Sequence, residues 1–199
     1  MLILASASVS RRQMLQNAGL DFTIETSGVD EDEVKLSLAA EKATPRDRAE
    51  RLAELKAKRV SLRHPEAMVI GADSTLACNG HLFDKPPTIE AARRQLQALA
   101  GQTHELHSSV VVARGGVRLW HCNEHARLTM RPLSDVFLDA YLARAGSAVT
   151  TSVGAYQLEG VGAHLFTRVE GDYFTILGLP LLPLLSFLAG HGIGLERAA

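Results

Sequence analysis

Hydroxyl and basic side chains gather where the first apolar run of the chain ends. Residues 2–5 form this run, Ser8 follows it, and Arg11 and Arg12 open a helical pattern that Gly19 stops. Backbone N–H groups at a helix N-terminus, serine hydroxyls and guanidinium groups together can bind an anion such as phosphate. The same residues also suit a capped surface helix with solvated arginines, so this segment alone allows both interpretations.

A carboxylate follows the second apolar run. Residues 67–72 are typical of a buried strand, and Asp73 comes directly after them. Open α/β sheets bind ligands beyond the carboxyl ends of their strands, so Asp73 is placed to hold a metal ion or to take a proton from water. The alternative is that Asp73 only caps a turn. Twelve residues on, Lys85 precedes Pro86; it either balances phosphate charge or is a solvated lysine.

Two more charged side chains can join such a site. Lys56 lies on a helix predicted over 44–62, with Thr44 as its N-cap, and is either a second phosphate contact or an ordinary surface lysine. Glu31 belongs to the acidic run 30–33. That run is either a solvated face or, where a divalent ion is held opposite Asp73, part of a metal site.

The predicted elements mix β-hairpins with helices. Asn79-Gly80 predicts a hairpin between residues 74–78 and 81–83, and a second hairpin is expected between 163–169 and 173–177. This order favours an α/β protein with a mixed sheet flanked by helices over a purely parallel sheet. The other predicted elements are strands at 22–26, 103–113 and 117–130, helices at 88–100 and 134–144, and a buried C-terminal helix within 176–189.

Length and composition exclude several classes of protein. A chain of 199 residues suits one large domain or two tight lobes. Lys and Arg number 21 against 22 Asp and Glu, which disfavours non-specific binding to nucleic acid. The most apolar stretch contains Pro180 and Pro183 and is too short to span a bilayer. With two cysteines and no signal peptide, we expect a cytoplasmic protein with neither a nucleic-acid nor a membrane partner.

Several short motifs follow one another along the chain in a specific order and spacing. They are Leu4-Ala5-Ser6-Ala7-Ser8 with Arg11-Arg12, Gly71-Ala72-Asp73, Lys85-Pro86, Leu99-Ala100-Gly101-Gln102-Thr103-His104, Gly154-Ala155-Tyr156 with Glu159-Gly160, Glu170-Gly171-Asp172-Tyr173 and Gly178-Leu179-Pro180-Leu181. In this order they resemble the Maf family of nucleoside triphosphate pyrophosphatases, and the resemblance extends from Leu2 to about Leu188.

The resemblance implies a fold, an activity and roles for named residues. The fold would be a mixed-sheet α/β domain over residues 1–199, with two lobes, a central cleft and a homodimer as its assembly. The activity would be hydrolysis of a nucleoside triphosphate to the monophosphate and pyrophosphate, with Mg²⁺ or Mn²⁺. Asp73 would be the general base and would hold the metal with Glu31. The residues around the phosphates would be Ser8, Arg11, Arg12, Lys56 and Lys85.

This chain departs from the family's usual pattern at three places. Val9 replaces a proline and Ser10 adds a residue before the arginines, a spacing that resembles the branch associated with 7-methyl-GTP. Ser74 stands where the family often has threonine. Leu55 stands where a glutamate usually precedes the lysine, which puts a carboxylate role there in doubt unless Glu54 takes it.

Glu159 carries the prediction of base specificity, together with Ser74. The branch of the family that prefers uracil and thymine tends to have glutamine at the position of Glu159. A carboxylate only accepts hydrogen bonds, so it matches the N1–H and N2–H₂ donors of guanine, and the positive charge of a methylated guanine strengthens the pair. Ser74 leaves slightly more room beside Asp73 than threonine would. The alternative is that Glu159 is an exposed turn residue before Gly160.

Hydrolysis of 7-methyl-GTP or a related guanine nucleotide is therefore the predicted function. The alternatives are a dTTP and UTP pyrophosphatase of the same family and a non-catalytic nucleotide-binding regulator of cell division. Asp73 disfavours the regulator, because a carboxylate facing phosphates repels them unless a metal ion lies between.

Overall fold

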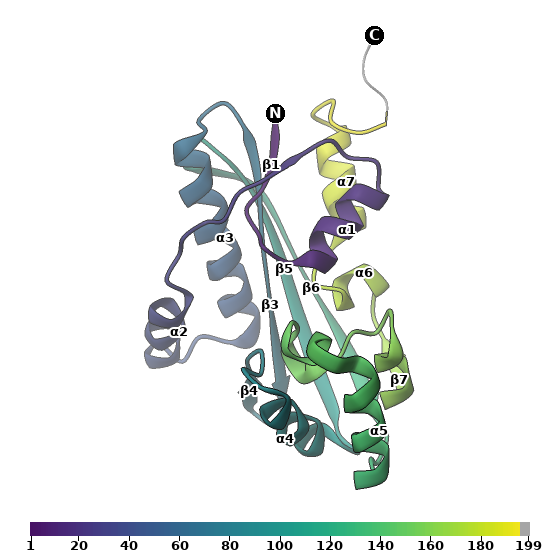
Figure 1. Ribbon diagram of the computed structural model, residues 1–199. Coiled ribbons are helices and arrows are strands. Elements are labelled where there is room, and N and C mark those ends of the chain that lie inside the picture. Colours follow the sequence, from purple (N-terminus) through teal and green to yellow (C-terminus); the bar gives the residue numbers. More distant parts are fainter. Residues whose placement is uncertain (196–199) are drawn as a thin grey trace. The chain divides into compact units, whose positions relative to one another are not determined.

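A seven-stranded mixed sheet, shown in Figure 1, forms the framework of the computed structural model, which describes residues 1–195. The strand order is β2-β1-β3-β5-β6-β7, and β4 pairs with β3. β1 pairs in parallel with β2 and β3, whereas β4 runs antiparallel to β3 and β7 antiparallel to β6. The strands are β1 (Leu2–Leu4), β2 (Thr23–Ile24), β3 (Met68–Cys78), β4 (His81–Phe83), β5 (Thr103–Arg114), β6 (Val117–Met130) and β7 (Phe166–Glu170).

The predicted α/β class with a mixed sheet flanked by helices is confirmed. The chain divides into two compact units, and β3, β5 and β6 contribute residues to both. The first unit comprises Met1–Asp73, Ser108–Glu124 and the segment from Gly178, and the second comprises Ser74–His107 and His125–Leu177. The central cleft and the single domain stay predictions, and residues 196–199 of that domain lie outside the described residues.

Helices cover both sides of the strands in the first unit. Figure 1 shows α3 (Pro45–Arg63) to one side of these strands, and α1 (Val9–Asn17) and α7 (Leu181–Ala189) to the other. α3 begins as predicted, because the Thr44 hydroxyl accepts a hydrogen bond from the Asp47 N–H at 3.1 Å. One cluster of buried side chains joins β1, α3 and β3, and a second joins α3 to β5.

Gly71 allows the α3 backbone to lie directly against β3. A Cβ atom on Gly71 would lie 2.2 Å from the carbonyl oxygen of Ala53 and 2.7 Å from the backbone nitrogen of Ala57, so no other residue fits. Side chains two residues apart on a strand share one face, so Asp73 points to the same side as Gly71. Lys56 lies between the two helix residues that meet Gly71. The close approach therefore brings Lys56 near Asp73.

The second unit has its own apolar core. Leucine and aromatic side chains of β3, β6 and the helices α4 (Ile89–Leu99) and α5 (Asp135–Ala145) fill it, together with side chains of the 3₁₀ turns η1 (Gly146–Thr150), η2 (Val153–Ala155) and η3 (Val161–Leu165). Thr88 caps α4 and Ser134 caps α5. The sequence predicts the Ser134 cap and a helix that starts at Thr88, and both predictions are confirmed. The Asn79-Gly80 hairpin between β3 and β4 is also confirmed.

The predicted end of the strand at Ala72 is wrong. β3 continues without a break from Met68 to Cys78, so Asp73 lies within the strand rather than after it. The sequence predicts separate strands at 67–72 and 74–78 with a break at Asp73, but Leu76 and Cys78 are buried in the second core and keep the chain extended through Asp73. The interpretation of Asp73 as a turn cap is therefore also wrong.

The second predicted hairpin is wrong as well. β7 pairs with β6, and the residues after it form the short helix α6 (Tyr173–Ile176) instead of a strand. Asp172 determines this outcome, because its carboxylate accepts a hydrogen bond from the Thr175 N–H at 2.9 Å and caps the helix. The C-terminal helix α7 begins only at Leu181, because Pro180 precedes it.

Replacement of Gly71 tests the contact between α3 and β3. We expect Gly71→Ala to lower the free energy of unfolding by about 3 kcal/mol, because the new methyl group meets helix backbone that cannot rotate away. Gly194→Ala is the matched control, since a Cβ there meets nothing within 4 Å, and it should change stability by less than about 0.5 kcal/mol. Urea unfolding measures both variants. Equal stability of the two would contradict the proposed close packing.

Candidate active site

Lys56 lies between two carboxylates in the first unit. Its ammonium nitrogen Nζ is 2.7 Å from Oδ1 of Asp73 and 2.8 Å from Oε1 of Glu31. The side chain of Lys56 is 8% exposed and that of Asp73 is 13% exposed, whereas the side chain of Glu31 is 42% exposed. Three residues that the sequence singles out separately therefore meet from α2 (Glu31–Ala40), α3 and β3. The interpretation of Lys56 as a surface lysine is wrong.

The acidic run before Lys35 has two structural roles. Asp30 caps α2, because its carboxylate accepts a hydrogen bond from the Glu33 N–H at 3.1 Å. Acidic side chains in the first turn also suit the positive end of the helix dipole. Glu31 is the first residue of the helix and reaches Lys56, while Asp32 and Glu33 are exposed. The solvated-face interpretation thus describes Asp32 and Glu33 but not Glu31.

Arg11 is a buried side chain that holds the backbone beside Asp73. Its Nε donates to the carbonyl oxygen of Gly178 at 2.8 Å, and its Nη1 donates to the carbonyl oxygen of Ala72 at 2.9 Å and to the Ser6 hydroxyl at 3.4 Å. Burial lowers the pKa of Arg11, and the charges of Asp73 and Glu31 oppose that shift. Arginine keeps its proton in proteins, so a buried positive charge lies near the carboxylate pair.

Ser8 and Arg12 differ from Arg11 in their surroundings. The Ser8 hydroxyl caps α1 by accepting a hydrogen bond from the Arg11 N–H at 3.4 Å, and Ser8 is half-buried. Arg12 is exposed. The capped-helix interpretation is therefore correct for Ser8, and the phosphate-binding roles of Ser8 and Arg12 stay predictions.

Three predicted residues belong to the second unit. Ser74 lies half-buried in β3, Lys85 is exposed two residues after β4, and Glu159 is exposed in the segment between η2 and η3. Their substrate-binding and specificity roles stay predictions.

Glu54 makes its contacts away from the Lys56 cluster. Its carboxylate forms ion pairs with Lys58 at 2.6 Å and with Arg118 at 3.2 Å. The hydrogen bond from Lys58, followed by the charge of Arg118, lowers the pKa of Glu54 although its partial burial opposes this shift. Leu55 is exposed. The structure therefore gives no support to Glu54 as a replacement for the family's glutamate.

Glu31 and Asp73 are the residues that would hold a divalent metal ion. Among the described residues, no three His, Cys, Asp or Glu side chains are grouped to hold a metal by themselves. Mg²⁺ is usually held by one or two carboxylates, with substrate phosphates and waters as the other ligands. The two carboxylates already share one cation, the ammonium of Lys56. This donor set therefore fits Mg²⁺ or Mn²⁺ brought by a phosphate substrate.

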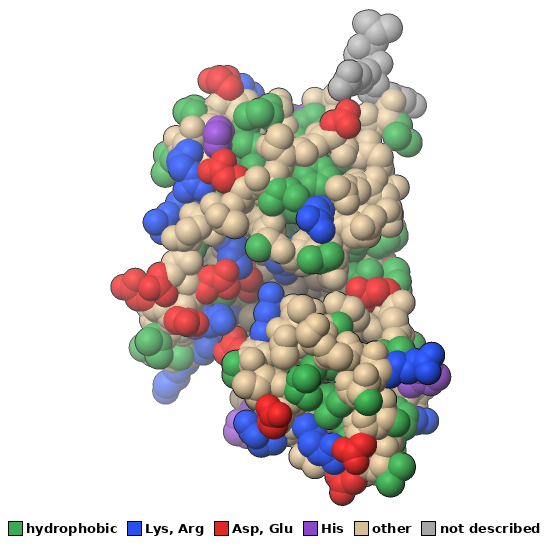
Figure 2. All heavy atoms as spheres, viewed as in Figure 1, with side chains coloured by type: hydrophobic (Ala, Val, Ile, Leu, Met, Phe, Trp, Pro, Cys, Tyr) green, Lys and Arg blue, Asp and Glu red, His purple; other side chains and the backbone are tan. Residues whose placement is uncertain are grey.

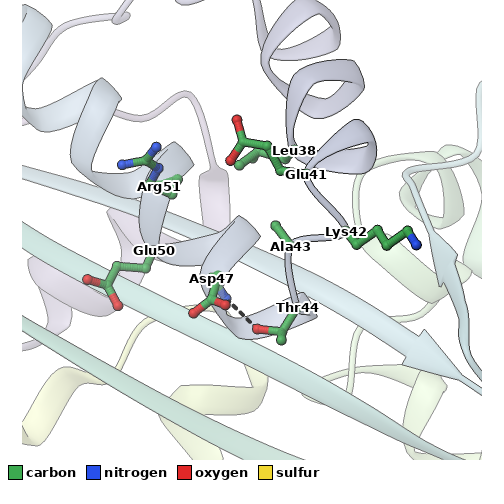
Figure 3. Close-up of a pocket in the computed structure, with 8 residues that line it drawn as sticks. All are labelled: Leu38, Glu41, Lys42, Ala43, Thr44, Asp47, Glu50 and Arg51. Carbon is green, nitrogen blue, oxygen red and sulfur yellow. Dashed lines mark hydrogen bonds between the residues drawn. The ribbon is translucent and has the colours of Figure 1, made fainter.

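A separate hollow of about 420 Å³ lies between the end of α2 and the start of α3. Figure 3 shows that Lys42 and Glu50 extend in opposite directions from it, and that the Asp47–Thr44 hydrogen bond belongs to the helix cap. Its charged groups do not converge on one point, and no predicted site residue lines it. The lining residues are Leu38, Glu41, Lys42, Ala43, Thr44, Asp47, Glu50 and Arg51.

Surface charge has no single sign on the face that Figure 2 shows. Lys and Arg side chains are interspersed there with Asp and Glu, and no basic stripe is visible. Within residues 1–195, no helix is both long enough and apolar enough to cross a bilayer. The absence of nucleic-acid and membrane partners stays a prediction.

The sequence predictions missed the structural roles of two motif residues besides Gly71. The sequence gives Arg11 and Arg12 the same predicted role, but only Arg11 is buried. His104 is fully buried in the second unit, with its Nε2 at 2.7 Å from the Tyr156 hydroxyl, and burial lowers the pKa of His104 to about 4. It is therefore neutral at pH 7. The available signal is the position of His104 two residues before the apolar Leu106, which places both on one face of the strand.

Comparison with known proteins identifies the family. The model of the family described as Maf-like protein matches residues 1–191. A nucleoside triphosphate pyrophosphatase of Paramagnetospirillum magneticum is 58% identical over 190 residues, which are 96% of this chain and 98% of that protein. One of Granulibacter bethesdensis is 54% identical, with 96% of each chain covered. A 7-methyl-GTP pyrophosphatase of Brucella abortus is 50% identical, with 94% of each covered.

Fold and site together define the class of this protein. It is an α/β protein with a mixed sheet whose first unit gathers two carboxylates, a buried lysine and a buried arginine. The chain belongs to the Maf family.

Arg11 and Arg12 form a natural pair for mutagenesis. We expect Arg11→Met to lower the free energy of unfolding by about 2–4 kcal/mol, because it leaves the buried carbonyl oxygens of Ala72 and Gly178 without these donors. Arg12→Met should change it by less than about 0.5 kcal/mol, because Arg12 is exposed. Thermal and urea unfolding measure the difference, and equal losses in the two variants would contradict the structural role of Arg11.

Proposed function

We propose that this protein hydrolyses 7-methyl-GTP, or a related modified guanine nucleotide, to the monophosphate and pyrophosphate. Whatever its preferred base, it is a nucleoside triphosphate pyrophosphatase of the Maf family. Relatives that are 50–58% identical over nearly the whole chain are named for this type of activity. The observation that carries the catalytic part of the proposal is the placement of Asp73 and Glu31 on either side of the Lys56 ammonium.

Asp73 is the proposed general base. Cleavage between the α- and β-phosphates needs a water molecule in line with the pyrophosphate leaving group, and the Asp73 carboxylate accepts the proton of that water. The hydrogen bond from Lys56 orients one oxygen of this carboxylate, and Arg11 holds the backbone next to it. A divalent cation bound by Glu31 and Asp73 would supply positive charge for the phosphate oxygens.

Cationic side chains are the proposed phosphate contacts. Arg12 and Lys85 have exposed side chains that are accessible to a ligand. Lys56 is buried but contacts the carboxylate pair. Ser8 is the N-cap of α1, and Arg11 lies beside Arg12 in the first turn of this helix. Bonds that strengthen as charge develops on the leaving pyrophosphate lower kcat when they are removed, and do not only raise KM.

The preference for a methylated guanine rests on Glu159 and Ser74. The exposed carboxylate of Glu159 is accessible to a base and accepts hydrogen bonds only, which suits the two donors on the guanine edge. Some relatives, such as that of Brucella abortus, are named 7-methyl-GTP pyrophosphatase, and this supports the same choice. A cytoplasmic location and a homodimer are further proposals, which rest on the family resemblance and on cysteine use.

Two other functions compete with this proposal. A dTTP and UTP pyrophosphatase would use the same carboxylates with a different base contact. A nucleotide-binding regulator of cell division would bind without hydrolysis, but it gains little from two carboxylates near phosphates. Pyrophosphate release from a panel of nucleotides, with and without Mg²⁺, separates all three.

Removal of the proposed general base tests the mechanism. We expect Asp73→Asn to lower kcat for pyrophosphate release by about 10²-fold or more, because asparagine keeps the shape but cannot accept the proton. Nucleotide binding, measured by calorimetry, should remain largely intact. Asp32→Asn, an exposed change on α2, is the matched control and should keep full activity. Retention of more than a tenth of the wild-type kcat by Asp73→Asn would exclude the role.

Base preference is tested by competing substrates. We expect kcat/KM for 7-methyl-GTP to exceed the values for dTTP and UTP by more than about tenfold, because a hydrogen-bonding mismatch to a base is costly. Glu159→Gln should narrow this ratio by lowering turnover of 7-methyl-GTP. Equal or faster turnover of dTTP and UTP by the wild-type protein would reject the substrate while leaving the pyrophosphatase activity intact.

A further inference from the structure

The Lys56 ammonium occupies the position of a cation between two acidic ligands. Its Nζ is within 2.8 Å of an oxygen of Glu31 and an oxygen of Asp73, and the lysine is 7% exposed overall. Both oxygens belong to the carboxylates that would hold a divalent ion. A protonated lysine and a metal ion therefore compete for the same two carboxylates.

Electrostatic repulsion opposes the binding of both cations between the two carboxylates. A divalent ion bound to both carboxylates would lie close to Nζ, and like charges at such a distance repel strongly in a partly buried site. Arg11 adds a second fixed positive charge, since its guanidinium is buried and feels the charges of both carboxylates. The nucleotide-free protein therefore already balances its carboxylates with its own cations.

We propose that Lys56 is a placeholder cation, which keeps the Glu31–Asp73 pair together without metal and which must leave at least one of the two carboxylates when a divalent ion binds. This inference rests on the proposed function for the use of metal. Displacement of the ammonium weakens metal binding to the nucleotide-free protein. A triphosphate removes this obstacle, because its oxygens bind the displaced ammonium and supply further ligands to the metal. The metal therefore binds tightly only together with the nucleotide.

A fixed phosphate contact is the competing role for Lys56. In that case Lys56 stays in place when metal binds, and its removal weakens nucleotide binding without changing metal affinity. The two roles differ in one quantity that does not require turnover, the affinity of the nucleotide-free protein for a divalent ion.

Mn²⁺ binding without nucleotide measures this quantity. The dissociation constant is obtained from the electron paramagnetic resonance signal of free Mn²⁺ for wild-type protein and for Lys56→Met, Lys56→Gln and Lys58→Met. We expect Lys56→Met and Lys56→Gln to bind Mn²⁺ at least about tenfold more tightly, because a neighbouring unit charge changes cation affinity by this order. Lys58→Met is the matched control, since Lys58 lies on the same helix and pairs with Glu54, and it should stay within about twofold of wild type.

Lys56→Gln guards against misfolding, because its amide can still donate to a carboxylate. Thermal unfolding establishes that each variant is folded. Affinity equal to or weaker than wild type in a folded Lys56 variant would overturn the proposal.

The wild-type protein gives an independent test if neither Lys56 variant folds. A buried, ion-paired ammonium exchanges its protons slowly, so the Lys56 side chain should give a ¹H–¹⁵N signal in nuclear magnetic resonance spectra of nucleotide-free protein. We expect saturating Mg²⁺ to shift or remove this signal. A signal that stays unchanged while Mg²⁺ binds would overturn the proposal.

Failure of the proposed function is distinguishable from failure of this inference. If Asp73→Asn keeps its pyrophosphate release while the Lys56 variants bind Mn²⁺ more tightly, the general-base role is wrong and the placeholder role stands. If Asp73→Asn is inactive while Mn²⁺ affinity is unchanged in the Lys56 variants, the reverse holds.

Discussion

The close approach of α3 to β3 at Gly71 is the constraint on which the rest of the site depends. Backbone meets backbone there, with no space for a Cβ atom between strand and helix. Because Asp73 shares the face of Gly71, the same contact determines which helix residue can reach Asp73. Lys56 lies between Ala53 and Ala57, the two helix residues that meet Gly71, and its ammonium reaches Asp73 at 2.7 Å. A packing requirement thus selects the partner of the proposed base.

Arg11 adds a second constraint, which acts through the backbone. A buried guanidinium is costly to desolvate, and burial accordingly lowers the pKa of Arg11. Three hydrogen bonds to Gly178, Ala72 and Ser6 offset part of that cost. They connect the first turn of the chain to the strand residue before Asp73 and to the segment before α7. The motif that resembles a phosphate-binding turn therefore also organises the carboxylate site.

Sequence patterns predicted the elements whose signals are local. The Thr44 and Ser134 caps and the Asn79-Gly80 hairpin each depend on a few neighbouring residues, and all three are confirmed. The sequence also predicts the end of β3 at Cys78, but it divides the strand wrongly into 67–72 and 74–78. The continuation through Asp73 depends on the burial of Leu76 in the second core. Local polarity at 73–75 carries no information about that distant contact.

The candidate site was predictable as a set of residues but not as an arrangement. The sequence singles out Asp73, Glu31 and Lys56 one by one. Their convergence depends on the packing of α2 against α3 and of α3 against β3, which spacing alone does not encode. Arg11 and Arg12 are identical in type and adjacent, and only the fold makes one buried and the other exposed.

Charge balance connects these observations to the chemistry. Two carboxylates close to each other repel, so the folded protein needs positive charge beside them in the absence of ligands. Lys56 supplies it by direct contact and Arg11 supplies it through space. A triphosphate brings negative charge to this position and a divalent ion brings positive charge, so binding the two together changes the local balance less than binding either alone. Under the proposed function, this arrangement of fixed charges favours a nucleotide–metal complex as the ligand over the free nucleotide or the free ion.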